Sequence, residues 1–248
     1  MRKPITFAIV FIIAFTSAIT GQPLNKAASN TKAKSKQVEL LEGTEGAKAI
    51  ARLGDLSRLV LRERLKQMRQ PYSQPSPLHV SEIIEEQHLS IASCKSVDRL
   101  KVVLQPVLDY HGRSLMSIYV LWSDQPKAYS VDRTAIFITT GLLIHASDEE
   151  LRGIVAHELA HEYVWDERKN ARQMKDVRLM RECELFCDAV AAFTLKEIGD
   201  DPVSYGRILE RVTGIEIKAG IGSRYESDTH PSLETRKKLN KFLCQQLD

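Results

Sequence analysis

The pentapeptide His-Glu-Leu-Ala-His at residues 157–161 constrains this chain more than any other part of its sequence. A spacing of four residues places His157 and His161 one turn apart on the same face of an α-helix. Two imidazoles in this arrangement can hold one Zn²⁺ ion. Glu158 lies between them in the sequence and can act as a general base toward water that the metal activates. The pentapeptide therefore predicts a metal site for hydrolysis, provided that it lies in a helix.

The residues before the pentapeptide predict such a helix. Ser147 and Glu150 have the spacing of a capping box, in which each side chain bonds the backbone N–H of the other residue. Acidic residues in the first turn also suit the positive end of the helix dipole. Apolar residues then recur at helical spacing, at Leu151, Ile154, Val155 and Leu159. We expect the pentapeptide to lie well inside this helix, and the alternative is a pair of surface histidines beside a glutamate.

A catalytic zinc ion takes three protein ligands and leaves one position open, so a third ligand is expected. The best candidate is Glu184, on a second helix predicted from about Val177 to Ile198 and ended by Gly199. The many apolar residues of this helix indicate that it is largely buried. A buried carboxylate is costly unless it is paired or bound to a metal, which favours a functional role. Glu182 is the competing position.

The combined pattern, HExxH followed by ExxxD on a later helix, resembles the M48 family of zinc metallopeptidases, a gluzincin-like group. The resemblance implies that Glu184 is the third zinc ligand and that Asp188 is the acid that orients a histidine ligand. Residues 136–143 resemble the strand and Gly-Leu-Leu turn that precede the metal helix in this family. The resemblance extends over residues 96–245, with its motifs in the order of the family.

The C-terminal segment Thr229-His230-Pro231-Ser232-Leu233-Glu234-Thr235-Arg236 resembles the His-Pro…Arg motif of the same family. Pro231 suits the first turn of a helix that runs to about Leu243. The resemblance implies that His230 stabilises the oxyanion or approaches the metal, and that Arg236 pairs with an acid near the site. The implied fold is α+β: a mostly helical zincin-type metallopeptidase domain with a small antiparallel or mixed sheet next to the metal-binding helix.

Three apolar segments before the pentapeptide are typical of β-strands, at residues 115–122, 128–131 and 135–139. In a zinc peptidase an edge strand at this place would offer backbone hydrogen bonds to an extended substrate. We expect residues 135–139 to be that edge strand, and the alternative is that they form an inner strand.

The N-terminus has the pattern of a secretory signal. Arg2 and Lys3 precede an apolar run, and small residues follow near Gly21. We expect residues 1–21 to be a signal peptide that directs the chain to the periplasm or out of the cell. The alternative is an uncleaved membrane anchor at residues 5–20, and membrane contact is expected only in that case. The predicted organisation continues with a flexible linker at 22–37, an N-terminal helical segment at 38–95 and the metallopeptidase domain at 96–248.

Charge and cysteine content exclude other classes of site. The net charge of +3 over 248 residues is too small to indicate nucleic-acid binding. No Cys-x-x-Cys pair is present, so a structural zinc site made of cysteines is not expected. A bridge between Cys183 and Cys187, one helical turn apart, would be strained. Two alternatives remain open. One is a long-range disulfide bridge that involves Cys94 or Cys244, and the other is that the cysteines are reduced thiols.

These observations predict a zinc-dependent endopeptidase with one Zn²⁺ ion per subunit, held by His157, His161 and Glu184. Glu158 would take a proton from water and deliver it to the leaving amine. We expect polypeptide substrates, including misfolded envelope proteins, and a role in protein quality control outside the cytoplasm. The alternative is a zinc-binding chaperone-like factor that is non-catalytic or latent, with His230 blocking the open metal position.

Overall fold

The computed structural model of the chain describes residues 94–131, 133, 135–219 and 229–247, and before them only positions 63, 65–67, 84, 85 and 91. The predicted signal peptide, residues 1–21, and linker, residues 22–37, lie outside the described residues. The same holds for almost all of the helical segment expected at 38–95.

Helices make up most of the described chain, and a small sheet precedes the pentapeptide. The elements are α5 (Cys94–Tyr110), β1 (Ser117–Leu121), β2 (Ala128–Val131), β3 (Ala135–Thr139), α6 (Thr140–His145), α7 (Asp148–Ala160), α8 (Trp165–Met174), α9 (Val177–Ile198), α10 (Val203–Lys218) and α12 (Leu233–Leu247). The predicted α+β fold, mostly helical with a small mixed sheet, is confirmed. Within the described part of the chain, no helix combines the length and apolar character that crossing a membrane requires.

The strands form a mixed sheet in the order β1-β3-β2. β1 runs parallel to β3, and β2 runs antiparallel to it. The expectation that residues 135–139 form the edge strand is wrong, because β3 is the central strand and all of its residues are buried. A continuous apolar run is typical of a strand buried on both faces, whereas an edge strand keeps some exposure. The edge strand next to α7 is β2, whose residues are all partly exposed.

Helix α7 begins as predicted. The Ser147 hydroxyl accepts a hydrogen bond from the Glu150 amide, and the Glu150 carboxylate accepts one from the Ser147 amide, which completes the capping box. The helix ends at Ala160, so the expectation that the whole pentapeptide lies well inside it is wrong. His161 is the C-cap, but its dihedral angles (φ −58°, ψ −23°) remain those of a right-handed helix. The one-turn relation between His157 and His161 is therefore preserved.

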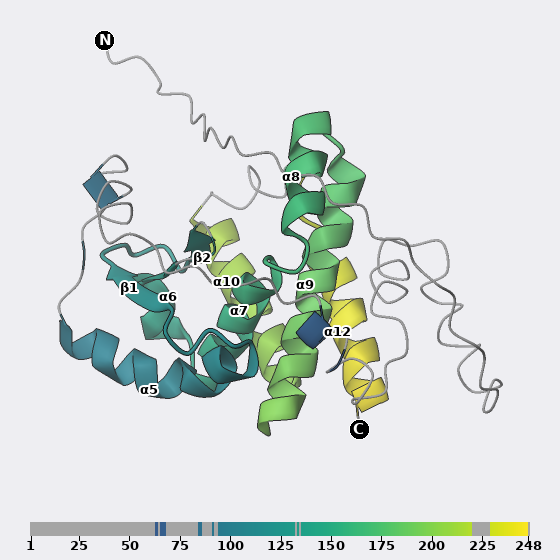
Figure 1. Cartoon of the computed structure of the whole chain (residues 1–248). Coiled ribbons are helices and arrows are strands. Elements are labelled where there is room, and N and C mark those ends of the chain that lie inside the picture. The colour runs from purple at the N-terminus through teal and green to yellow at the C-terminus, as the bar shows by residue number, and fades with distance from the viewer. Residues whose placement is uncertain are drawn as a thin grey trace, which may run out of the picture.

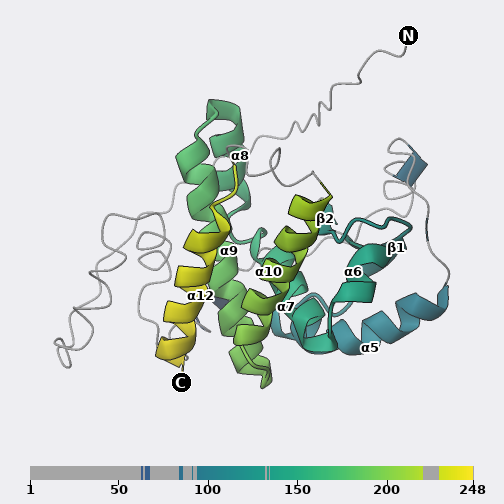
Figure 2. The same cartoon turned by 180° about the vertical axis from the view of Figure 1, so that it is seen from behind.

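Helix α9 lies at the centre of the molecule, with α7, α8 and α12 packed against it (Figures 1 and 2). Its bounds agree with the prediction. Asp176 caps its start, and Gly199 (φ 88°) ends it in the left-handed conformation that glycine adopts without a steric penalty. One apolar core joins α9 to α12, and a second joins α5, the sheet, α7 and α10. Since α9 contributes to both cores, the polar side chains on its α7-facing side are held in a dry interior.

Candidate metal centre

Three side chains from α7 and α9 meet at one point. The Nε2 atoms of His157 and His161 lie 3.3 and 3.8 Å from the same oxygen, Oε2 of Glu184. The two imidazole rings are nearly perpendicular, with their centroids 4.9 Å apart. All three side chains are buried. Packing of α7 against α9 therefore brings two nitrogen donors and one carboxylate oxygen together.

This donor set fits a zinc ion. Two imidazole nitrogens and one carboxylate oxygen are a common ligand set of catalytic zinc. His157, Glu158 and His161 also form a group whose ligand atoms all lie within 4.8 Å of one another. Glu182, the competing position for the third ligand, instead pairs with Arg178 one turn earlier on α9, at 3.1 Å. The structure thus brings Glu184, and not Glu182, to the two histidines.

Glu158 lies beside the edge strand. Its Oε2 accepts a hydrogen bond of 3.0 Å from the backbone N–H of Ser130 on β2. Burial raises the pKa of the Glu158 carboxyl above its ordinary value, although the positive charge of His157 acts in the opposite direction. A raised pKa makes a carboxylate a better proton acceptor, as general-base chemistry requires.

His157 is held by a polar network on the side away from Glu184. Its Nδ1 lies 2.9 Å from Oδ1 of Asp188 and 2.8 Å from the hydroxyl of Tyr205, and that hydroxyl donates to the same aspartate oxygen at 2.6 Å. Burial by itself would lower the pKa of His157. Hydrogen bonds to Asp188 and Glu184, together with their charges, outweigh this effect and raise the pKa to about 9. Asp188 therefore fixes the ring that presents Nε2 to Glu184.

Arg236 of α12 completes this network. Its Nη2 donates to Oδ1 of Asp188 at 2.6 Å and to the Tyr205 hydroxyl at 2.8 Å, and its Nε donates to Oδ2 of Asp188 at 2.8 Å. Burial would raise the pKa of the Asp188 carboxyl, but the adjacent charges of Arg236 and His157 hold the pKa below its usual range. The structure thus places Asp188 against a histidine of the site and Arg236 against that acid.

His230 lies at the rim of the site. Its side chain is 47% exposed, and its Nε2 is 3.8 Å from Oε2 of Glu184. The expectation that Pro231 lies in the first turn of the last helix is wrong, because α12 begins at Leu233. The Ser232 hydroxyl accepts a hydrogen bond from the Thr235 amide, so Ser232 caps the helix and leaves Pro231 outside it.

Sequence reasoning missed three residues that contact the site. Arg168 of α8 donates to Oε1 of Glu184 at 3.1 Å. Burial acts to raise the pKa of Glu184, but the histidines and Arg168 hold that pKa well below its usual range. Tyr205 comes from α10, and Sγ of Cys187 lies 3.2 Å from Nδ1 of His161. Only Cys187 had a local signal, since it lies three residues after Glu184 and so on the same helix face.

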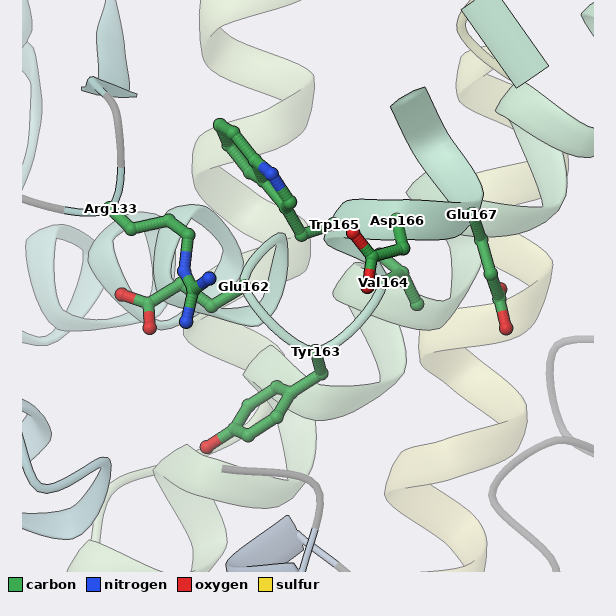
Figure 3. Close-up of a pocket in the computed structure, with 7 residues that line it drawn as sticks. All are labelled: Arg133, Glu162, Tyr163, Val164, Trp165, Asp166 and Glu167. Atoms are coloured by element: carbon green, nitrogen blue, oxygen red, sulfur yellow. The ribbon is translucent and has the colours of Figure 1, made fainter. Parts of the chain in front are cut away.

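A hollow of about 190 Å³ is lined mainly by residues that follow His161 in the sequence. Its walls are Arg133, in the turn between β2 and β3, and residues 162–167, which directly follow His161. In Figure 3, Arg133 extends toward Glu162, and Trp165 and Asp166 lie on the other side of the hollow. Arg113 forms a buried ion pair with Glu162, which fixes that wall.

A helix with the HExxH sequence, packed against a helix that supplies a carboxylate and beside a small mixed sheet, is the architecture of an HExxH peptidase domain. Residues 96–181 match the model of peptidase family M48, so the resemblance drawn from the motifs is confirmed. The matched stretch includes the pentapeptide and ends before Glu184, Asp188 and His230. The placement of those three residues therefore depends on the structure.

Two curated relatives are similar to part of this chain. A protease HtpX homolog of Acidiphilium cryptum (strain JF-5) is 46% identical over 48 residues, which are 18% of this chain and 17% of the relative. A protease HtpX homolog of Sulfurovum sp. (strain NBC37-1) is 30% identical over 86 residues, 31% of each chain. The chain thus spans less than a third of the length of either relative.

Proposed function

We propose that this protein is a zinc-dependent endopeptidase that hydrolyses polypeptides. The observation that supports this most directly is the convergence of His157, His161 and Glu184, with the carboxylate of Glu158 beside the histidines and hydrogen-bonded to the edge strand β2. A zinc ion held by these three ligands would polarise a peptide carbonyl and make water nucleophilic at neutral pH.

The surrounding residues have defined roles in this reaction. Glu158, with its raised pKa, takes the proton of the attacking water and gives it to the leaving amine. His230 lies at the open rim, where its imidazole can donate to the oxyanion that forms from the carbonyl. Asp188 holds His157 in place, and Arg168 occupies Oε1 of Glu184 so that Oε2 remains directed at the histidines.

The shape of the site favours an extended polypeptide. β2 is the edge of the sheet next to α7, and an extended peptide can add to such an edge through backbone hydrogen bonds. The hollow beside Arg133 would then receive one substrate side chain. The relatives named as proteases support this assignment. With the signal pattern at residues 1–21, we propose misfolded envelope proteins as substrates, in the periplasm or outside the cell, or at the membrane if residues 5–20 stay as an anchor.

A second candidate is a latent or non-catalytic zinc-binding factor. The specific observation in its favour is His230, whose Nε2 lies 3.8 Å from Glu184 and could occupy the position that substrate needs. The position of Glu158 favours catalysis, because zinc binding alone does not require a base.

Casein cleavage by purified Glu158→Gln protein, together with metal analysis, tests the proposal. We expect zinc content to stay at the wild-type level and the rate to fall by about 10²–10⁴-fold, the usual contribution of a general base. Asp148→Asn is the matched control, since it removes a carboxylate from the exposed start of the same helix. Full activity of Glu158→Gln, or cleavage that resists a zinc chelator, would refute the assignment. A rise in activity of His230→Ala would favour the latent form, and a fall would favour a role in oxyanion binding.

A further inference from the structure

The two histidines of the candidate metal centre differ in the group that contacts the Nδ1 atom of the ring. A histidine that binds a metal through Nε2 carries its proton on Nδ1, and the acceptor of that N–H sets the ring orientation. For His157 this acceptor is the carboxylate of Asp188, at 2.9 Å. For His161 the atom in the same place is Sγ of Cys187, at 3.2 Å.

The position of Cys187 makes this contact a defined one. The thiol and the His161 ring are both buried, so the contact lies away from bulk solvent. Cys187 also lies within the same turn of α9 that supplies Glu184 and Asp188. One turn of helix therefore presents a ligand, the partner of His157 and the partner of His161.

We propose that Cys187 is a positioning residue for His161: its sulfur accepts the Nδ1–H of the ring and keeps Nε2 directed toward Glu184. The effect of this contact on metal binding rests on the proposed function, because it requires the zinc site. The contact between Cys187 and His161 is present without a metal ion. A thiol is a weak acceptor compared with a carboxylate. The His161 side of the site is therefore held less firmly than the His157 side.

Loss of the sulfur would leave the Nδ1–H of His161 buried and without an acceptor. The ring would then rotate, or its proton would move to Nε2, and either change removes a ligand atom from the site. The metal affinity should fall even where the fold is unchanged. A hydroxyl in place of the thiol keeps an acceptor at this position.

The first test is the Zn²⁺ affinity of the full chain, measured by competition with a chromophoric chelator. We expect Cys187→Ala to bind Zn²⁺ about tenfold more weakly, the lower end of the usual effect of such partners, and Cys187→Ser to stay closer to the wild type. Cys183→Ala is the control, because Cys183 is equally buried one turn earlier on α9, so its truncation removes the same sulfur atom from the core of the same helix. Wild-type affinity of Cys187→Ala, or an equal loss in Cys183→Ala, would overturn the proposal.

The second test reads the position of the proton directly. In metal-free protein labelled with ¹⁵N-histidine, two-bond NMR correlations show which ring nitrogen is protonated, and the His161 signals are assigned by their loss in His161→Gln. We expect the Nδ1–H tautomer in the wild type and a shift toward Nε2–H in Cys187→Ala. An Nε2–H tautomer in the wild type would refute the contact. Wild-type protein that binds no zinc would refute the proposed function, and the tautomer would still decide the role of Cys187.

Discussion

Replacing Arg236 with glutamine should destabilise the fold strongly, because the arginine is part of a buried ion pair. The side chains of Arg236 and Asp188 are 15% and 2% exposed, and two hydrogen bonds of 2.6 and 2.8 Å join them. Removing one partner of such a pair leaves an uncompensated charge in the interior and costs about 3–5 kcal/mol. Two charge-assisted hydrogen bonds at roughly 1.5–3 kcal/mol each lead to a similar value. This is a large part of the ~5–15 kcal/mol that stabilises a typical domain.

The assay is urea unfolding at neutral pH, followed by circular dichroism, for Arg236→Gln and for Lys238→Gln. Lys238 lies on the same helix and pairs with Glu234 at the surface, where both side chains are about two-thirds exposed (67% and 68%). An exposed pair of this kind contributes about 0.5 kcal/mol or less. The reasoning is wrong if Arg236→Gln loses less than about 1 kcal/mol, or no more than Lys238→Gln does.

A double-mutant cycle assigns the loss to the contact with Asp188. If the two charges depend on each other, Asp188→Asn combined with Arg236→Gln should cost less than the sum of the single changes, since the double variant leaves no buried charge unpaired. Additive effects would show that Arg236 acts through another contact, such as its hydrogen bond to Tyr205.

Three further predictions concern stability. Gly141→Ala would place a Cβ 2.3 Å from a backbone oxygen, so we expect the free energy of unfolding to fall by at least about 1–3 kcal/mol. Gly214→Ala meets open space within α10 and should raise the free energy of unfolding by up to about 1 kcal/mol. Unfolding midpoints equal to that of the wild type would contradict both predictions. Burial by itself would raise the pKa of Glu150. The hydrogen bond and the charge of Arg211 outweigh the effect of burial and hold this pKa below the ordinary 4.5. Glu150 therefore stabilises the fold above pH 4.5, and this contribution is lost as pH falls through the lowered pKa, so Glu150→Gln should flatten the acid limb of thermal stability. An unchanged acid limb would rule this out.

Interactions within about one helical turn could be predicted from the sequence. The capping box at Ser147 and the bounds of α9 depend on side chains that bond backbone groups three or four residues away. The one-turn spacing of His157 and His161 is equally local. These features formed as expected because no distant part of the chain is needed to satisfy them.

The choice between Glu182 and Glu184 illustrates where local reasoning ends. The two residues are two positions apart on a helix, so their side chains point in nearly opposite directions. The sequence alone does not say which of the two side chains faces α7. The resemblance to the M48 family favoured Glu184. Packing of α9 against α7 places that carboxylate against the histidines.

By itself, the sequence determined the HExxH pentapeptide, the helices on either side of the candidate site and the mixed fold class. Only the tertiary structure decided that β3 is the central strand, that Arg236 reaches Asp188, and that a thiol lies against His161. These contacts join groups far apart in the chain, so they exist only once both apolar cores have packed the helices together. The physical reason is burial: in a dry interior each polar group must find a partner, and packing determines which partner is near.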